Sequence, residues 1–250
     1  MTLTFDNVDL MASPYIVRYL YHDGWPERRL DMEKRAHERG ALLLDTQFGE
    51  KVFAMAGKIT GATQDELETN IETFKELMSR EAQNLDIGYA SSTRRYKAYV
   101  DELKINRDFY HLLHAPFSLK FIVPSGISIN PVAVNDSHDN ITDASYSNTI
   151  TILGSAKPTP TVTLTIDSAT TATVAEVTIN GDKITITTAL VATNVLVIDC
   201  ENKKVTKDGT EVDYAGIFPR FKVGSNAYTI ALTRTACQYD LDIDYFKTYL

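Results

Sequence analysis

Asp136, Ser137, His138 and Asp139 place a hydroxyl, an imidazole and two carboxylates next to one another in the sequence. A nucleophile, a general base and an orienting acid of these types catalyse acyl transfer when they converge in space. Consecutive side chains on an extended chain point apart, so adjacency in sequence works against convergence. We therefore favour a solvated polar loop over a catalytic site, and we predict no catalytic residue in the chain.

Two further sets of residues have the chemistry of metal ligands. His111 and His114 are three residues apart and could meet on one helical turn, but their apolar neighbours favour a packed or interface role. Asp240, Asp242 and Asp244 alternate with apolar residues, which on a strand puts three carboxylates on one face, where a hard cation such as calcium could bind. We favour a solvent-exposed acidic strand face, whose charges discourage pairing with the edge strand of another sheet. We predict no metal site.

The cysteines and the basic residues also have ordinary explanations. Cys200 and Cys237 could form a disulfide only if their Cα atoms lie within about 7 Å; free, buried thiols are favoured, and their redox state stays open. One stretch concentrates basic residues, namely Arg28, Arg29, Lys34, Arg35 and Arg39. Acidic residues interleave with them, namely Glu27, Asp31, Glu33 and Glu38. Neighbouring charges of both signs favour salt bridges, on a solvent-exposed face or between subunits, over phosphate binding.

The composition is typical of a globular protein and argues against several functions. Of 250 residues, 44% are hydrophobic and 23% charged, which argues against disorder. The formal net charge of −8 has the wrong sign for a protein whose main task is to grip nucleic acid. We expect no membrane span, no signal peptide and no cofactor, because no long apolar stretch, phosphate loop, dinucleotide fingerprint or nucleophile elbow is present. The chain is predicted not to be an enzyme.

The first half of the chain predicts strands and one helix. Thr63 and Glu66 have the spacing of a capping box, and Leu67, Ile71, Phe74 and Met78 then form one apolar stripe. Strands are predicted at residues 15–21, 42–44, 51–59, 85–89, 94–103 and 117–123. One helix among several strands predicts an α+β sheet or small barrel on which the helix packs.

The second half predicts an antiparallel sandwich, with the domains divided near Pro124-Ser125-Gly126 into residues 1–127 and 128–250. Asn180-Gly181 and Asp208-Gly209 are hairpin turns. The predicted strands are residues 161–166, 174–179, 183–187, 195–198, 204–206, 210–214 and 227–233. The fold class is therefore mainly β.

Several segments together resemble the distal tail protein family of long-tailed (siphovirus) phages. In the second half these are residues 195–214, Gly216-Ile217-Phe218-Pro219 and Gly224-Ser225-Asn226. In the first half the layout is similar: residues 57–61, the capped helix from Thr63, residues 85–89 and residues 94–96. The resemblance covers nearly the whole chain, although each segment by itself is only a short strand-turn-strand pattern.

The resemblance implies a structural protein of the tail tip or baseplate. Residues 1–127 would be a belt domain forming a homohexameric ring, single or stacked, and residues 128–250 a galectin-like β-sandwich. The implied partners are the tail tube protein, the hub or tail-associated protein and receptor-binding proteins, with DNA only passing through the channel. The protein would be assembled in the host cytoplasm and reside in the virion. Six copies at −8 each would carry −48, and an acidic channel would let DNA slide without sticking.

A lectin-like module that binds host carbohydrate is the alternative, because galectin-like sandwiches can bind sugars. Such sites stack a sugar on an aromatic ring, typically tryptophan, beside histidine, asparagine and arginine. The single tryptophan, Trp25, lies outside the predicted sandwich, which has only His138, Arg220 and Arg234 as histidine and arginine. The resemblance thus implies the fold without the sugar site.

Overall fold

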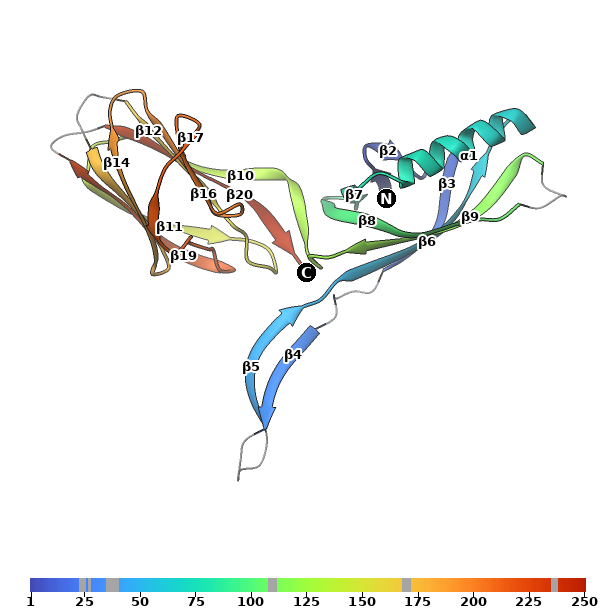
Figure 1. Ribbon diagram of the computed structural model, residues 1–250, viewed down its shortest axis with the longest axis horizontal. Coiled ribbons are helices and arrows are strands. Elements are labelled where there is room, and N and C mark those ends of the chain that lie inside the picture. Colours follow the sequence, from blue (N-terminus) through green and yellow to red (C-terminus); the bar gives the residue numbers. More distant parts are fainter. Residues whose placement is uncertain (23–25, 27, 35–40, 108–111, 168–171, 235–237) are drawn as a thin grey trace. The chain divides into compact units, whose positions relative to one another are not determined.

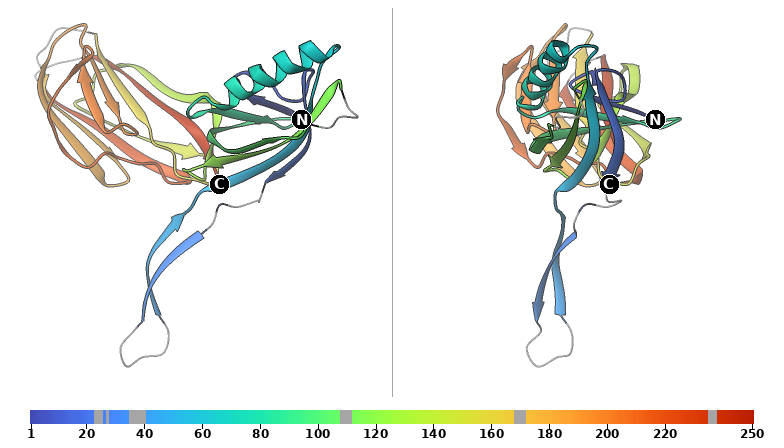
Figure 2. Two further views of the ribbon diagram at one scale, coloured as in Figure 1. Left: turned by 45° about the vertical axis from the view of Figure 1, so that its right-hand side comes forward. Right: turned by 90° about the vertical axis from the view of Figure 1, so that its right-hand side faces the viewer.

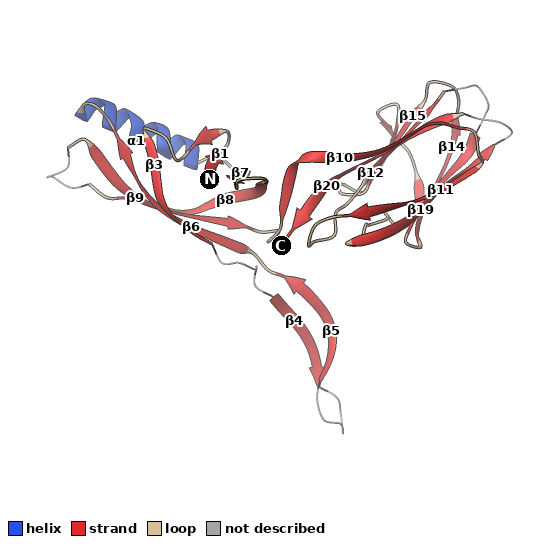
Figure 3. Ribbon diagram, turned by 180° about the vertical axis from the view of Figure 1, so that it is seen from behind, coloured by secondary structure: helices blue, strands red, loops and turns tan. Residues whose placement is uncertain are grey.

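Alternating apolar and polar residues produce antiparallel strands along most of the chain, and the described residues contain a single helix (Figure 3). The computed structural model describes residues 1–22, 26, 28–34, 41–107, 112–167, 172–234 and 238–250. They divide into unit 1, residues 1–129 with Leu250, and unit 2, residues 130–249. The predicted mainly β fold is confirmed. In the described part, no helix is long and apolar enough to cross a membrane.

Unit 1 is an antiparallel sheet in the order β2-β1-β7-β8-β9-β6-β3 with one helix packed on it. Its strands are β1 (Thr2–Phe5), β2 (Val8–Asp9), β3 (Tyr15–His22), β6 (Lys51–Thr60), β7 (Gln83–Gly88), β8 (Thr93–Ile105) and β9 (His114–Val123). The long strand β8 pairs with β7 through its first half and with β9 through its second half. The strands predicted in this half are therefore present, and most extend further than predicted.

Helix α1 (Gln64–Met78) begins at the predicted cap. The Thr63 hydroxyl accepts from the Glu66 amide at 3.2 Å, and the Glu66 carboxylate accepts from the Ala62 amide at 2.8 Å. This is a capping box shifted by one residue, since the return bond reaches Ala62 instead of Thr63 itself. The predicted apolar stripe is buried, together with Leu77.

The core of unit 1 lies between the helix and the sheet; Figure 1 shows helix α1 lying along one side of that sheet. Phe74 of the helix packs on Tyr15 and Phe117, with ring centroids 4.8 Å apart in both pairs. Phe5 of β1 contacts Phe121 of β9 at 4.9 Å, although two other strands separate β1 from β9 in the sheet. Burial of these aromatic rings, together with the aliphatic side chains of the same core, stabilises the unit.

A two-stranded ribbon is inserted in the chain between β3 and β6, which pair with each other in the sheet. It consists of β4 (Arg28–Lys34) and β5 (Ala41–Phe48), which pair with each other and with no other strand among the described residues (Figure 2). At its base, Gly126 has φ +65°, and a Cβ there would lie 2.3 Å from the Gly49 carbonyl and 2.9 Å from Pro26. Only glycine fits this position without strain.

Unit 2 is built from two sheets that enclose one apolar core. The first has the order β17-β16-β15-β12-β20-β10 and the second β11-β19-β13-β14-β18. The strands of the first sheet are β10 (Ser128–Ile141), which starts in unit 1, β12 (Thr161–Ile166), β15 (Val195–Asp199), β16 (Lys204–Lys207), β17 (Thr210–Glu211) and β20 (Tyr239–Tyr249). Those of the second are β11 (Ser145–Ile152), β13 (Ala172–Ile179), β14 (Asp182–Leu190), β18 (Tyr214–Gly216) and β19 (Gly224–Arg234).

The hairpin turns of unit 2 have the predicted chemistry. Asn180-Gly181 has φ values of 54° and 94°, and Asp208-Gly209 has 49° and 80°, as a two-residue turn with both centres left-handed requires. The predicted strand 210–214 is wrong in one respect: β17 ends at Glu211, and Tyr214 begins β18 in the other sheet. The chain therefore changes sheets at Val212 and Asp213.

Candidate functional site

The outer strand β3 presents two tyrosines to solvent. Arg18 is an extra residue in the pairing with β6, because Val17 faces Gly57 and Tyr19 faces Ala56. This bulge shifts the alternation, so Tyr15 and Val17 are buried whereas Tyr19 and Tyr21 are 73% and 67% exposed. In the described part of the chain β3 pairs only with β6, so its other side is a sheet edge.

The β4–β5 ribbon presents further apolar side chains. Leu30, Met32 and Phe48 are exposed by 46%, 58% and 37%. A two-stranded ribbon is marginally stable alone in water, and apolar side chains on it usually mark a contact with another molecule. We refer to the exposed apolar side chains of the β3 edge and of the ribbon, namely Tyr19, Tyr21, Leu30, Met32 and Phe48, as the assembly surface of unit 1, after the role proposed for them below.

Three of the five residues of the basic concentration in the sequence, Arg28, Arg29 and Lys34, lie on this ribbon. Arg28 is exposed in β4, as are Asp31 and Glu33. Arg29 and Lys34 also belong to β4; Glu27, Arg35, Glu38 and Arg39 lie outside the described residues. Charges of both signs on a projecting ribbon suit a contact with a protein surface better than one with phosphate.

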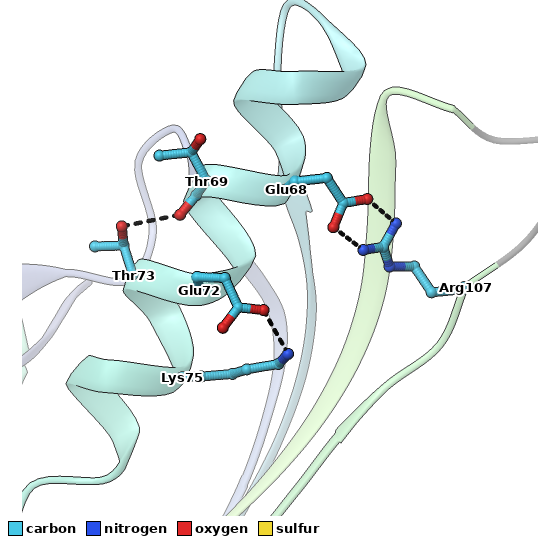
Figure 4. A network of polar contacts seen from close by, with 6 residues as sticks. All are labelled: Glu68, Thr69, Glu72, Thr73, Lys75 and Arg107. Atoms are coloured by element: carbon cyan, nitrogen blue, oxygen red, sulfur yellow. Dashed lines mark hydrogen bonds and ion pairs between the residues drawn. The ribbon is translucent and has the colours of Figure 1, made fainter.

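The exposed face of helix α1 is polar and tied to the end of β8. Glu68 and Arg107 form a two-pronged ion pair, and Lys75 donates to Glu72 at 2.7 Å (Figure 4). Arg107 hydrogen bonding holds the pKa of Glu68 below its ordinary value, and the same bond raises the pKa of Arg107. The ion pair ties the helix to Arg107, which follows the end of β8.

The loop predicted for Asp136–Asp139 is wrong, because the four residues lie within strand β10. Since alternate residues share a face, Asp136 and His138 point to the same side and their polar atoms approach to 3.1 Å. The Tyr228 hydroxyl donates to Asp136 at 2.8 Å, and the Asn148 amide lies 3.2 Å from the His138 ring nitrogen. The sequence did not predict a strand here, because these polar residues of β10 show no alternation of apolar and polar side chains.

This group is a structural cluster rather than a hydrolytic triad. Tyr228 is 1% exposed, and burial followed by the Asp136 bond raises the pKa of its hydroxyl. Tyr146 packs on His138 with ring centroids 5.1 Å apart. Ser137 is on the opposite face of the strand, so the nucleophile does not join the imidazole and carboxylate.

The three alternating aspartates of β20 lie half-exposed on one strand face, opposite the buried residues Leu241 and Ile243. Asn135 donates to Asp242 at 3.2 Å and to Asp244 at 2.9 Å, and the Asn140 amide donates to Asp240 at 2.7 Å. Among the described residues, no group of three histidines, cysteines or acids has the geometry of a metal site.

The remaining candidate residues are two histidines, two cysteines and the tryptophan. His114 is half-buried and begins strand β9, so it does not lie on the helical turn that a metal site shared with His111 would need. His111 lies outside the described residues. Cys200 is a buried free thiol whose pKa burial raises to about 12, whereas Cys237 lies outside the described part, as does Trp25.

The first residues of β19 have a role that the sequence did not reveal. The pattern Gly224-Ser225-Asn226 predicted a turn, which is wrong, because these residues lie in β19 and pair with β11. Asn226 is fully buried; its side-chain oxygen accepts from the Lys222 backbone amide, and its side-chain NH2 donates to the carbonyls of Lys222 and Gly224, at 2.7–2.8 Å. The same oxygen accepts from Asn180 at 2.7 Å, which joins the start of β19 to the Asn180-Gly181 hairpin.

Comparison with known proteins finds a matching family model and solved structures of similar fold. Residues 153–249 match the siphovirus-type tail component, C-terminal domain. The Dit protein (gp 19.1) of phage SPP1, described as a paradigm of the hub adsorption apparatus in phages that infect Gram-positive bacteria, has a TM-score of 0.74 and 15% identity. That match covers 100% of this chain and 99% of the SPP1 chain.

A chain of the activated phage P2 baseplate with calcium matches 97% of this chain and 96% of its own length. Its TM-score of 0.49 and identity of 9% are too low to establish a common fold. No curated protein sequence matches the chain. The resemblance stated from the sequence is confirmed: residues 153–249 match the siphovirus-type tail component, C-terminal domain, and the chain has the fold of SPP1 Dit along its whole length.

Proposed function

We propose that this chain forms a homohexameric ring at the distal end of a phage tail and joins the tail tube to the tail-tip hub. The ring is made by the N-terminal belt domain, residues 1–127, and the galectin-like sandwich, residues 128–250, is carried on it. The observation that carries the proposal is the assembly surface of unit 1, where a sheet edge and a ribbon expose five large apolar side chains.

A closed ring explains why such a surface is tolerated. An exposed sheet edge invites pairing with another chain, and a head-to-tail contact that closes after a fixed number of copies uses every edge and leaves none for aggregation. Full-length similarity of fold to a hub protein supports the same reading. The tail tube protein, the hub protein and receptor-binding proteins are the partners proposed for the two faces and the sandwich.

The net charge supports the proposed passage of DNA. At −8 per chain, six copies carry −48, and a wall of acidic character repels the phosphate backbone. A tail-tip density map that placed mostly lysine and arginine on the channel wall would contradict this part of the proposal.

Light scattering coupled to size-exclusion chromatography tests the ring. The wild-type chain should elute with six or twelve times the monomer mass, and Met32→Ser should shift it toward monomer, raising the concentration for half-assembly by about tenfold or more. Ile217→Ser is the matched control, because Ile217 is 65% exposed but belongs to unit 2. The proposal would be contradicted if the wild-type chain were a monomer at all concentrations in solution and also in purified tail tips.

A further inference from the structure

The two sheets of unit 2 have four edge strands among the described residues: β17 and β10 in the first sheet, and β11 and β18 in the second. An exposed edge offers unpaired backbone groups to other chains, so proteins shorten edge strands, bend them or place charges and proline on them. Three of the four edges have such protection. Strand β17 has two residues, one of them Glu211, and β18 has three. Strand β10 carries Pro131 and the charged residues Asp136 and Asp139.

Strand β11 lacks all of these protections. It is eight residues long, from Ser145 to Ile152, and contains neither a charged residue nor a proline. Its register with β19 is continuous from end to end, so no bulge bends it. Threonine, isoleucine and tyrosine in its sequence favour extended structure. The second sheet therefore ends in a long, regular and uncharged edge.

The printed backbone contacts show which groups of β11 point away from the sheet. The Leu232 amide donates to the Ala144 carbonyl at 2.9 Å, which puts the even-numbered positions in the hydrogen-bonded pairs with β19. The Thr149 amide donates instead to the side-chain oxygen of Asn148 at 2.8 Å. Because the two kinds of pair alternate, the odd-numbered residues direct their N–H and C=O groups away from β19. These residues are exposed: Ser145, Ser147, Thr149 and Thr151.

We propose that β11 pairs in antiparallel fashion with β11 of a second copy of this chain, across a two-fold axis. A register centred on Asn148 pairs all four outward-facing positions with one another. Ser147 then faces the partner's Thr149, and Ser145 faces the partner's Thr151. Each pair exchanges both backbone hydrogen bonds, and the Asn148 side chain releases the Thr149 amide for this purpose.

The side chains of β11 complement those of a second β11 in this register. On the outer face hydroxyl side chains meet hydroxyl side chains, and on the inner face Tyr146 meets the partner's Ile150; both kinds of cross-strand pair are favourable. No like charges meet, because the strand has none. A two-fold contact uses the free edges of both strands and adds no further copy. The pairing involves unit 2 alone and does not depend on the ring proposed for unit 1.

Sedimentation equilibrium of the full chain tests the pairing separately from the ring, in protein that also carries Met32→Ser. This chain should form a reversible dimer, and adding Thr149→Lys should raise the concentration for half-dimerisation by about tenfold or more. Thr187→Lys, at an exposed position of β14 in the same sheet, is the matched control and should leave that concentration unchanged. If Met32→Ser still forms rings, the same comparison is made between twelve and six copies. If no ring forms at all, the wild type is itself the dimer.

Disulfide trapping tests the register. Asn148 faces its own copy at a position without backbone hydrogen bonds, where Cα atoms lie about 4.5 Å apart, within the range of a disulfide. Ser145 lies about 20 Å from its own copy. In a Cys237→Ser chain, whose Cys200 is buried, Asn148→Cys should cross-link in oxidised glutathione about ten times faster or more than Ser145→Cys.

Three results would overturn the proposal. The first is a Met32→Ser chain that remains a monomer at millimolar concentration, which would leave the β11 edge to a strand of another protein. The second is a Thr149→Lys chain that associates as tightly as the Thr187→Lys control. The third is equal cross-linking of the two cysteine variants. Thr149→Lys changes an exposed side chain, so it decides the question if Asn148→Cys does not fold.

Discussion

Replacing Tyr228 with phenylalanine removes one hydroxyl from a buried polar cluster and leaves the ring in place. That hydroxyl donates to the Asp136 carboxylate at 2.8 Å, in a side chain that is 1% exposed. Asp136 has a second contact, with the His138 ring nitrogen at 3.1 Å, and its side chain is 25% exposed. The carboxylate can therefore recruit water after the substitution.

The expected cost at pH 7 follows from this geometry. Hydrogen bonds to charged groups contribute about 1.5–3 kcal/mol, and a partner that recovers water loses less than one left buried. We expect Tyr228→Phe to lower the free energy of unfolding by about 1–2 kcal/mol at pH 7. Tyr214→Phe, at 44% exposure, should change it by less than about 0.5 kcal/mol.

The same hydroxyl makes the cost depend on pH. Burial, and then the bond to Asp136, raise the pKa of Tyr228 above its ordinary value of 10. The unfolded chain consequently ionises this tyrosine above pH 10 while the folded chain holds it neutral, so the wild type loses stability as the pH rises from about 10 toward the folded pKa. Phenylalanine cannot ionise. The difference between the two proteins should shrink by about 1.4 kcal/mol between pH 9 and pH 11.

Urea unfolding followed by circular dichroism at pH 7, 9, 10 and 11 measures both quantities. The wild type should be more stable than Tyr228→Phe at pH 7, and the two should have nearly equal stability at pH 11. A difference that stays constant from pH 7 to pH 11 would refute the reasoning, because it would mean that the folded protein does not hold the hydroxyl neutral.

Three other substitutions test the packing of unit 1 by the same unfolding measurement. Phe74→Ala removes a fully buried ring that contacts Tyr15 and Phe117 and should cost about 3–5 kcal/mol, so a loss below 1 kcal/mol would contradict the packing. Thr63→Ala removes the helix cap and should cost about 1 kcal/mol, with Thr63→Ser as the tolerated control. Gly126→Ala should cost more than about 2 kcal/mol because of its positive φ and the clash with the Gly49 carbonyl; a neutral result would contradict the tight approach.

Local rules predicted the elements whose signals lie in neighbouring residues. Thr63 and Glu66 cap the helix because both interact with amides within one turn. Asn180-Gly181 and Asp208-Gly209 form the hairpins because they adopt left-handed backbone at low cost. The turn predicted at Gly224-Ser225-Asn226 is wrong, because these residues lie in β19, and the four hydrogen bonds of the Asn226 side chain were not predicted.

Local rules failed where burial depends on distant strands. Strand β10 was missed around Asp136 and His138, because these polar residues are covered by Tyr146 and Tyr228 from the facing sheet. The segment 210–214 was predicted as one strand, yet Glu211 and Tyr214 pair in different sheets. Polarity alone cannot indicate a strand whose polar side chains are covered by a residue as distant as Tyr228, 92 positions after Asp136.

By itself, the sequence determined the mainly β class, the capped helix, the hairpin turns and the resemblance to a tail protein, because each of these depends on residue type at short spacing. Tertiary structure alone decided which side chains became exposed at the β3 edge, where one bulge at Arg18 turns Tyr19 outward. It also decided that Lys51 and Arg94, 43 positions apart in the sequence, line one pocket. Long-range strand pairing sets register and burial, and no short window of sequence contains the free energy of that pairing.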